Sequence, residues 1–184
     1  MEDVRVAVVD VDSILWDFLS PMTRKMRDLF PEKVIPKEFD TWECPESYFE
    51  SIQDMLDLFT EIHEEQDQHK PFDGAVELLQ TLREKGYLIH IASNRPAHTR
   101  PVLVKWLDEQ GLHYDAVFAD EDKTVIFGSP EIDLLIDDAP RNQKAGLERG
   151  FKVLSLEYKY NQHMDEVIKF PTLQHMTSFI QRKI

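Results

Sequence analysis

Cysteine is almost absent from this sequence, which has Cys44 alone among its 184 residues. One thiol cannot close an internal disulfide, so the chain lacks the pattern of a disulfide-stapled secreted domain. The acidic side chains of Glu43 and Glu46 flank Cys44. Neighbouring carboxylates disfavour a thiolate, and we therefore expect no cysteine nucleophile.

Basic residues are also scarce. Lysine and arginine together number 21 against 35 aspartates and glutamates, which gives a formal net charge of -14. Such an acidic surface repels nucleic-acid phosphates, so we expect no nucleic-acid polymer as a partner. The same field repels small phosphoesters, and a substrate of that kind therefore requires a bound cation beside it.

Long apolar runs are missing as well. No stretch approaches the roughly 18 apolar residues that a membrane-spanning helix requires, so we expect no membrane partner. The sequence begins with Glu2 and Asp3, close to a strand pattern, instead of the basic and apolar regions of a signal peptide. The expected location is the cytoplasm.

The sequence does contain a regular alternation of strand and helix patterns from residue 72 onward. Short apolar runs rich in β-branched residues predict strands that are buried on both faces, as in a parallel sheet. The alternation is the signature of βαβ units and predicts an α/β fold with a doubly wound parallel sheet. The predicted strands are 4–9, 87–92, 116–119, 132–136 and 152–156, and the predicted helices of this part are 72–85, 98–110, 143–149 and 172–182.

Residues 18–70 interrupt this alternation. They contain two helix patterns, 17–29 and 45–65, joined by a loop with prolines at 31 and 36, and no convincing strand pattern. We therefore expect a small helical cap, inserted after the first strand. The predicted domains are a core of residues 1–17 and 71–184 and a cap of residues 18–70.

Polar residues mark four of the predicted strand ends or the loops beside them. They are Asp10 and Asp12, then Ser93 and Asn94, then Lys123, and finally Asp137 and Asp138. Ligands of open parallel sheets bind at the carboxyl ends of the strands, so these side chains are expected to converge if the strands are neighbours.

The residue types in this set are those of phosphoryl transfer. Grouped carboxylates form a hard oxygen site that suits Mg²⁺, and the cation lets a carboxylate stand beside a phosphate dianion. One carboxylate can attack phosphorus while a second acts as general acid and base. A lysine and a hydroxyl can hold the phosphate oxygens. Each strand end taken alone is better explained by helix capping, and only the ordered set indicates chemistry.

Several other polar residues have simpler interpretations. Lys105 is a rival phosphate-binding lysine, but it lies within a predicted helix where a solvated face is the simpler explanation. His63, His69 and His98 have no metal-ligand spacing, and we interpret them as surface residues. The basic residues Arg24, Lys25 and Arg27 are assigned to a solvated helix face, with substrate contact from the cap left open.

The ordered set resembles the haloacid dehalogenase superfamily, and within it most closely the 5′(3′)-deoxyribonucleotidase family. The stretch Asp10-Val-Asp-Ser-Ile-Leu-Trp-Asp-Phe18 is similar to that family's Asp-x-Asp-Gly-Val-Leu-Ala-Asp-Phe opening. Asp122-Lys-Thr-Val125 is similar to its lysine motif, and Asp133-Leu-Leu-Ile-Asp-Asp138 to its final acidic motif. A helical cap directly after the first motif also fits, so the resemblance extends over nearly the whole chain.

The resemblance implies a Mg²⁺-dependent phosphomonoesterase that acts on nucleoside monophosphates through an aspartyl phosphate. Asp10 would be the nucleophile and a metal ligand. Asp12 would be the general acid and base and would give its backbone carbonyl to the metal. Asp138 would be a further metal ligand, with Asp137 in support.

The substrate would be held by other residues of the same set. The resemblance implies that Ser93 and Asn94 bind the phosphate and that Lys123 binds the phosphate and Asp10. It also implies that Phe18 stacks on the nucleobase, although a core position is the simpler reading of a phenylalanine. Trp42 is a weaker candidate for a base contact.

The sequence departs from the family pattern at a few positions. Ser13 stands where the family has glycine, which puts the efficiency of the site in question because glycine supplies backbone freedom there. Asn94 stands where a second hydroxyl is common, and residues 127–131 lengthen the segment between the lysine and the final acids. The alternatives left open are a phosphatase for a sugar phosphate or another metabolite, a non-catalytic binding protein of the same fold, and, least favoured, a dehalogenase. A homodimer is also left open.

Overall fold

The computed structural model describes residues 4–184, apart from the side chain of Cys44. The expectations for Glu2, Asp3 and the Cys44 thiol therefore fall outside the described part of the chain. Strand β1, Arg5–Val9, lies near the middle of a six-stranded parallel sheet with the order β3-β2-β1-β4-β5-β6. This is the strand order of a doubly wound nucleotide-binding fold and confirms the predicted fold class.

The other strands follow the sequence patterns closely. They are β2 (Tyr87–Asn94), β3 (Ala116–Asp120), β4 (Ile132–Ile136), β5 (Lys152–Leu156) and β6 (Ile168–Phe170). The sequence did not predict β6, because a three-residue edge strand carries too few residues to show a pattern.

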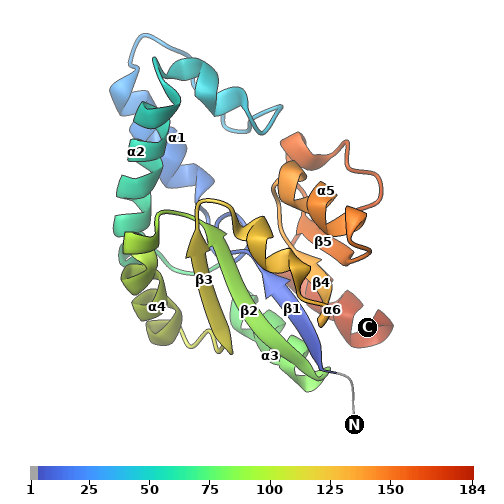
Figure 1. The fold of residues 1–184 in the computed structure, drawn as a ribbon. Coiled ribbons are helices and arrows are strands. Elements are labelled where there is room, and N and C mark those ends of the chain that lie inside the picture. The colour runs from blue at the N-terminus through green and yellow to red at the C-terminus, as the bar shows by residue number, and fades with distance from the viewer. Residues whose placement is uncertain (1–3) are drawn as a thin grey trace.

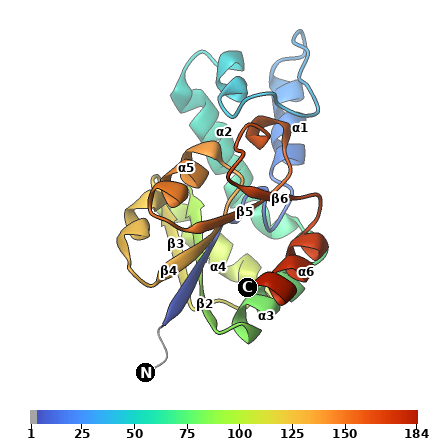
Figure 2. The ribbon, with the colours of Figure 1, turned by 90° about the vertical axis from the view of Figure 1, so that its right-hand side faces the viewer.

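Helices cover both faces of the sheet, as the buried residues of β1 require. Ala7 and Val9 pack in a cluster with α3 (Ala75–Glu84), α4 (Arg100–Glu109) and α6 (Leu173–Lys183). Val6 and Val8 point the other way and join a second cluster with α5 (Pro140–Glu148). Figure 2 shows α5 on one side of the sheet and α3 and α6 on the other.

The predicted cap region consists of helices and loops in the structure. Its helices are α1 (Leu19–Leu29) and α2 (Ile52–Glu64), with the short 3-10 helices η1 (Cys44–Tyr48) and η2 (Gln66–Gln68). The predicted single helix 45–65 is therefore wrong. The backbone is extended at Phe49 and Ser51, and the Ser51 hydroxyl accepts a hydrogen bond from the amide of Asp54, so that a new helix begins there.

The chain leaves the first strand and returns to the sheet region at adjacent points. Trp16 forms a β-bridge with Pro71, and the amide of Phe72 donates to the carbonyl of Leu15 at 2.8 Å. Figure 1 shows α1 and α2 beyond the ends of the strands toward which the arrows point. The division into a core and a cap at residues 17/18 and 70/71 stays a prediction, and this bridge is consistent with it.

Within residues 4–184, none of the helices is both long enough and apolar enough to cross a membrane. Three further 3-10 helices lie in the loops: η3 (Ala97–Thr99), η4 (Lys123–Gly128) and η5 (Lys159–Asn161).

Candidate active site

The candidate site lies where the order of the strands reverses. Asp10 directly follows β1, and Asp137 and Asp138 directly follow β4, which is the neighbour of β1 in the sheet. The amide of Asp10 donates to the carbonyl of Ile136 at 2.8 Å, which joins the two strand ends. This is the switch point of a doubly wound sheet, where ligands bind in such folds.

Three buried carboxylates meet at this switch point. Asp10, Asp137 and Asp138 have exposed fractions of 5%, 0% and 1%, and each offers one oxygen within 4.8 Å of the others. Lys123, the first residue of η4, is equally buried and places its Nζ 2.5 Å from Asp10 and 2.7 Å from Asp137. One ammonium group therefore faces three carboxyl groups.

The protonation equilibria reflect this excess of acid. Burial raises the pKa of Asp10, and the nearby acids raise it further against the opposing effect of Lys123. Burial and the charge of Asp137 raise the pKa of Asp138 to about 7. Burial would lower the pKa of Lys123, but the carboxylates of Asp10 and Asp137 raise it on balance, so the lysine keeps its charge.

The donor set fits a small hard cation. It consists of buried carboxylate oxygens only, which are the ligands that Mg²⁺ prefers, and burial together with the neighbouring carboxylates raises the pKa of Asp10 and of Asp138. Asp137 already accepts hydrogen bonds from the amide of Ala139 and the side chain of Asn142. Asp10 and Asp138 are therefore better placed than Asp137 to contact an ion.

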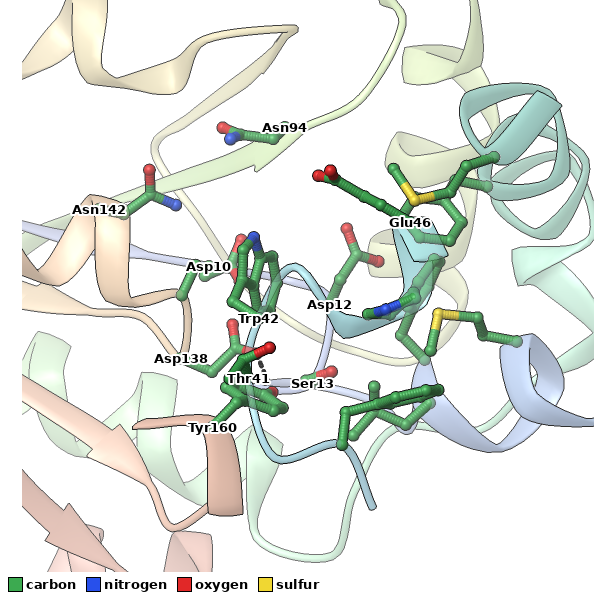
Figure 3. A pocket seen from close by; sticks show the side chains of 18 of the residues that line it. Asp10, Asp12, Ser13, Thr41, Trp42, Glu46, Asn94, Asp138, Asn142 and Tyr160 are labelled. Carbon is green, nitrogen blue, oxygen red and sulfur yellow. Dashed lines mark hydrogen bonds between the residues drawn. The ribbon is translucent and has the colours of Figure 1, made fainter. Parts of the chain in front are cut away.

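Asp12 does not join this cluster. Its carboxylate accepts hydrogen bonds from Ser93 Oγ at 2.8 Å, from Trp16 Nε1 at 2.9 Å and from Arg95 Nη2 at 3.0 Å. Figure 3 shows it on the opposite side of the pocket from Asp10 and Asp138. Among the predicted metal-binding residues, Asp12 is thus the one whose carboxylate lies apart, which leaves only its backbone carbonyl for the predicted metal contact.

The surroundings of Asp12 keep it ionised. Burial by itself raises the pKa of its carboxyl group, but Arg95 and His63 outweigh burial and hold that pKa well below its usual range. His63 Nε2 lies 3.2 Å from Asp12 Oδ2. His63 is 3% exposed and belongs to α2, so its interpretation as a surface residue is wrong.

Arg95 is the functional residue that the sequence analysis missed most completely. It is 1% exposed, and besides Asp12 it donates to Ser93 Oγ at 2.8 Å and to Gln66 Oε1 at 2.6 Å. Gln66 lies in η2, directly after α2. Arg95 follows the predicted pair Ser93 and Asn94 in the sequence, and a positive charge one residue beyond a strand end was the available signal.

The two predicted phosphate-binding residues at the end of β2 face different ways. Ser93 is fully buried and its hydroxyl is directed at Asp12. Asn94 lines the pocket, and its Oδ1 accepts from the backbone amide of Lys123 at 3.1 Å, which fixes the start of η4. Lys105 is exposed and pairs with Asp67 at 2.8 Å, so Lys123 is the lysine at the switch point.

The pocket above the carboxylates has apolar walls. It encloses roughly 790 Å³ of empty space, part of it open to solvent. Its polar floor includes Asp10, Asp12, Lys123 and Asp138. Its other walls carry Phe18, Leu19, Met22, Phe39, Trp42, Met55 and Phe59, all of them from the region between β1 and α3.

Phe18 and Trp42, the predicted base-contacting residues, occupy different places in this pocket. Phe18 is 7% exposed and packs edge-on against Phe59 with ring centroids 5.3 Å apart, so it also serves the core. Trp42 is 42% exposed and its ring lies edge-on to Tyr160 at 5.2 Å. Among the basic residues of α1, Lys25 pairs with Glu61 and Glu65 on the neighbouring helix.

Ser13 takes a left-handed backbone conformation, which favours glycine. Its φ is 60°, and among residues 4–184 it is the one non-glycine residue with a positive φ. The conformation is held by hydrogen bonds on both sides, since its amide donates to Trp16 at 3.0 Å and its carbonyl accepts from Tyr158 at 2.7 Å. Serine therefore tolerates the geometry, at a cost of about 1–2 kcal/mol in the left-handed region.

Comparison with solved structures shows which superfamily has this fold. A HAD-superfamily hydrolase from Ehrlichia chaffeensis superposes with a TM-score of 0.60 at 17% identity, covering 98% of this chain and 97% of that one. The HAD-hydrolase YfnB from Bacillus subtilis, solved with magnesium, gives a TM-score of 0.61 at 18% identity, over 97% and 99%. A D,D-heptose 1,7-bisphosphate phosphatase from Burkholderia thailandensis gives 0.57 at 14% identity, over 97% and 99%. The protein has the fold of the haloacid dehalogenase superfamily.

The family is narrower. A family model described as "5' nucleotidase, deoxy (Pyrimidine), cytosolic type C protein" matches residues 4–183, nearly the whole chain. The protein therefore belongs to this family and is a hydrolase of phosphoric monoesters. No curated protein sequence matches the chain.

Proposed function

We propose that this protein is a Mg²⁺-dependent phosphatase that hydrolyses deoxynucleoside monophosphates through a phosphate ester on Asp10. The observation that carries the proposal is the buried group of Asp10, Lys123 and Asp138 beneath an apolar pocket. The family description supports the nucleotide part of the proposal.

Asp10 is proposed as the nucleophile. Its carboxylate oxygen forms a bond to phosphorus while the bond from phosphorus to the leaving ester oxygen breaks. The leaving oxygen takes a proton from Asp12. Water then attacks the phosphorus of the phosphorylated Asp10, gives a proton to Asp12 and releases inorganic phosphate and the free Asp10 carboxylate.

Lys123 and the cation divide the work of neutralising charge. The ammonium group of Lys123 holds Asp10 in place and faces the oxygens of the incoming phosphate. Bound Mg²⁺ would offset the charge of the phosphate dianion beside the carboxylates, with Asp10 and Asp138 as its side-chain ligands. Asp12 would contribute its backbone carbonyl, and Asp137 would orient Lys123. The magnesium found in YfnB supports this assignment.

The general-acid step requires a change at Asp12. A carboxyl group that bonds to Arg95 and His63 is ionised and suits the base that activates water. To protonate the leaving oxygen it must carry a proton, so the contacts with Arg95 and His63 must loosen when substrate enters. Because His63 lies on α2, we propose that the cap region moves with this step, as lids over active sites do.

The pocket walls support a nucleoside over a simple sugar as the leaving group. A flat base can stack on aromatic rings such as those of Phe18 and Trp42. A sugar phosphate needs several hydrogen-bond partners for its hydroxyls, and the wall formed by residues 18–63 offers Thr41, Glu46 and His63 among mostly apolar residues. The word cytosolic in the family description supports the cytoplasm as the compartment.

A panel of substrates tests the proposal. We expect deoxynucleoside monophosphates to be hydrolysed faster than ribonucleotides and sugar phosphates, with activity lost on removal of Mg²⁺ and restored by its return. Faster turnover of sugar phosphates would overturn the nucleotide assignment but would leave the assignment as a phosphatase in place.

We expect Asp10→Asn to lower turnover by at least about a thousandfold, because the amide is a poor nucleophile. Mg²⁺-dependent turnover retained in that variant would overturn the mechanism.

A further inference from the structure

Tyr160 contacts the acidic cluster from a part of the chain that the proposed mechanism does not use. It lies in η5, the short helix that follows β5, and is 2% exposed. Its hydroxyl donates a hydrogen bond to Oδ2 of Asp138, the dashed line in Figure 3. Tyr160 therefore takes one oxygen of the carboxylate that we assign to the metal.

The turn that carries Tyr160 is fixed to the backbone of the site. The side chain of Asn161 is fully buried and donates to the carbonyl of Asp138 at 3.2 Å and to the carbonyl of Leu156 at 3.0 Å. Its Oδ1 accepts from the amide of Tyr158 at 3.1 Å. The segment after β5 and the loop after β4 are thus joined as one unit, and the phenol has little freedom to leave Asp138.

The ring of Tyr160 packs against two other aromatic rings. It stacks on Tyr158 with ring centroids 5.1 Å apart and an interplanar angle of 5°. It also makes an edge contact with the ring of Trp42, whose loop is further joined to η5 by an ion pair between Asp40 and Lys159. A side chain packed in this way presents its hydroxyl at a fixed point.

We propose that Tyr160 is a positioning residue that holds the carboxylate of Asp138 in the orientation in which it binds Mg²⁺. The inference rests on the metal assignment of the proposed function. A ligating carboxylate with one oxygen fixed by a hydrogen bond offers its other oxygen in one direction, and loss of such an outer partner typically weakens metal binding 10–100-fold. The hydroxyl that fixes Asp138 belongs to Tyr160, which is distant in sequence from the acidic motif.

The test compares Tyr160→Phe with the wild type by titration calorimetry with MgCl₂ in the absence of substrate. The variant keeps the ring and its stacking and loses only the hydroxyl. We expect its affinity for Mg²⁺ to fall about 10–100-fold. We also expect the Mg²⁺ concentration that gives half-maximal turnover to rise by a similar factor, because the hydroxyl acts through the metal ligand Asp138.

Tyr114→Phe is the matched control. Tyr114 also donates its hydroxyl to an aspartate, Asp108, at 3.1 Å, but on the surface and away from the site. We expect this variant to bind Mg²⁺ as the wild type does. Equal Mg²⁺ affinity in Tyr160→Phe and the wild type would overturn this inference and leave the metal assignment in place. A Tyr160→Phe protein whose circular dichroism spectrum shows that it is unfolded would also overturn the inference. Absence of Mg²⁺ binding in the wild type would overturn the metal assignment itself and the inference with it.

Discussion

At the scale of single residues, the charge balance around Asp12 depends on Arg95. The guanidinium is buried, and it joins Asp12 to Ser93 and, through Gln66, to the end of α2. A buried ion pair of this kind contributes little compared with apolar packing, but its breakage leaves an uncompensated charge in a low-dielectric interior. The arginine is therefore more important for the position of Asp12 than for the stability that the intact pair adds.

This contact predicts a large effect of Arg95→Met. We expect the free energy of unfolding to fall by about 3–5 kcal/mol, because Asp12 and Ser93 lose a buried partner. Urea denaturation followed by circular dichroism measures this change. Arg83→Met is the control, since Arg83 pairs with Asp115 on the surface and its loss should cost at most about 1 kcal/mol. Equal losses of unfolding free energy in the two variants would show that the buried contacts of Arg95 stabilise the fold no more than a surface ion pair does.

Residue types at strand ends were enough to find the acidic cluster and its lysine, but not the groups that surround it. Asp10, Lys123 and Asp138 follow strands or their loops in a parallel sheet, so their convergence can be predicted from the order of elements alone. His63 and Tyr160 reach the site from a helix inserted after β1 and from the turn after β5. Their approach depends on how those segments pack in three dimensions, which no local pattern encodes.

At the scale of elements, α5 leaves no room for a side chain at the point where it faces β4. Gly146 lies in this helix, and a Cβ atom added to it would stand 2.7 Å from Cδ2 of Leu135 in β4. The glycine therefore sets the distance between α5 and the strand that delivers Asp137 and Asp138. The sequence analysis predicted this helix but started it at 143, whereas Pro140 already begins it in the structure.

We expect Gly146→Ala to destabilise the protein by about 1–3 kcal/mol, because the added methyl group would overlap the Leu135 side chain and force that side chain or α5 to shift. Thermal unfolding measures the change, and a smaller Mg²⁺-dependent turnover should accompany it since the acidic loop lies between these two elements. Lys144→Ala, at an exposed position of the same helix, is the control and should be neutral within about 0.5 kcal/mol. A Gly146→Ala variant as stable as the wild type would show that α5 can shift freely.

At the scale of the whole molecule, the acidic cluster makes stability depend on pH and on the cation. The pKa of Asp138 is about 7 in the folded protein, well above the value of about 4 for an aspartate in an unfolded chain. The folded state thus holds a proton that the unfolded state has released, and the stabilisation from Asp138 is lost as pH rises toward and through 7. Lowered histidine pKa values, such as that of His63, act in the opposite direction below about pH 6.5.

We therefore expect the melting temperature of the metal-free protein to fall by several degrees between pH 6.5 and pH 8, and added Mg²⁺ to restore it at pH 8. Differential scanning calorimetry in buffers with and without MgCl₂ measures both effects. Asp138→Asn isolates the carboxyl group and should flatten the pH dependence. A melting temperature that rises with pH over this range, or ignores Mg²⁺, would contradict the proposed charge excess.

The bridge between Trp16 and Pro71 has a consequence for how proteins of this architecture diversify. The segment between them begins and ends at neighbouring points, so its length enters the stability of the sheet only through a closure entropy that grows slowly with the number of residues. Longer, shorter or unrelated sequences can be accommodated at such a junction without any change in the strand order of the sheet. Changes of specificity can then be inherited separately from the acidic cluster: the stretch can be redesigned for a new leaving group while Asp10 and Asp138 stay in place, provided that His63 and Gln66 keep their contacts with Asp12 and Arg95.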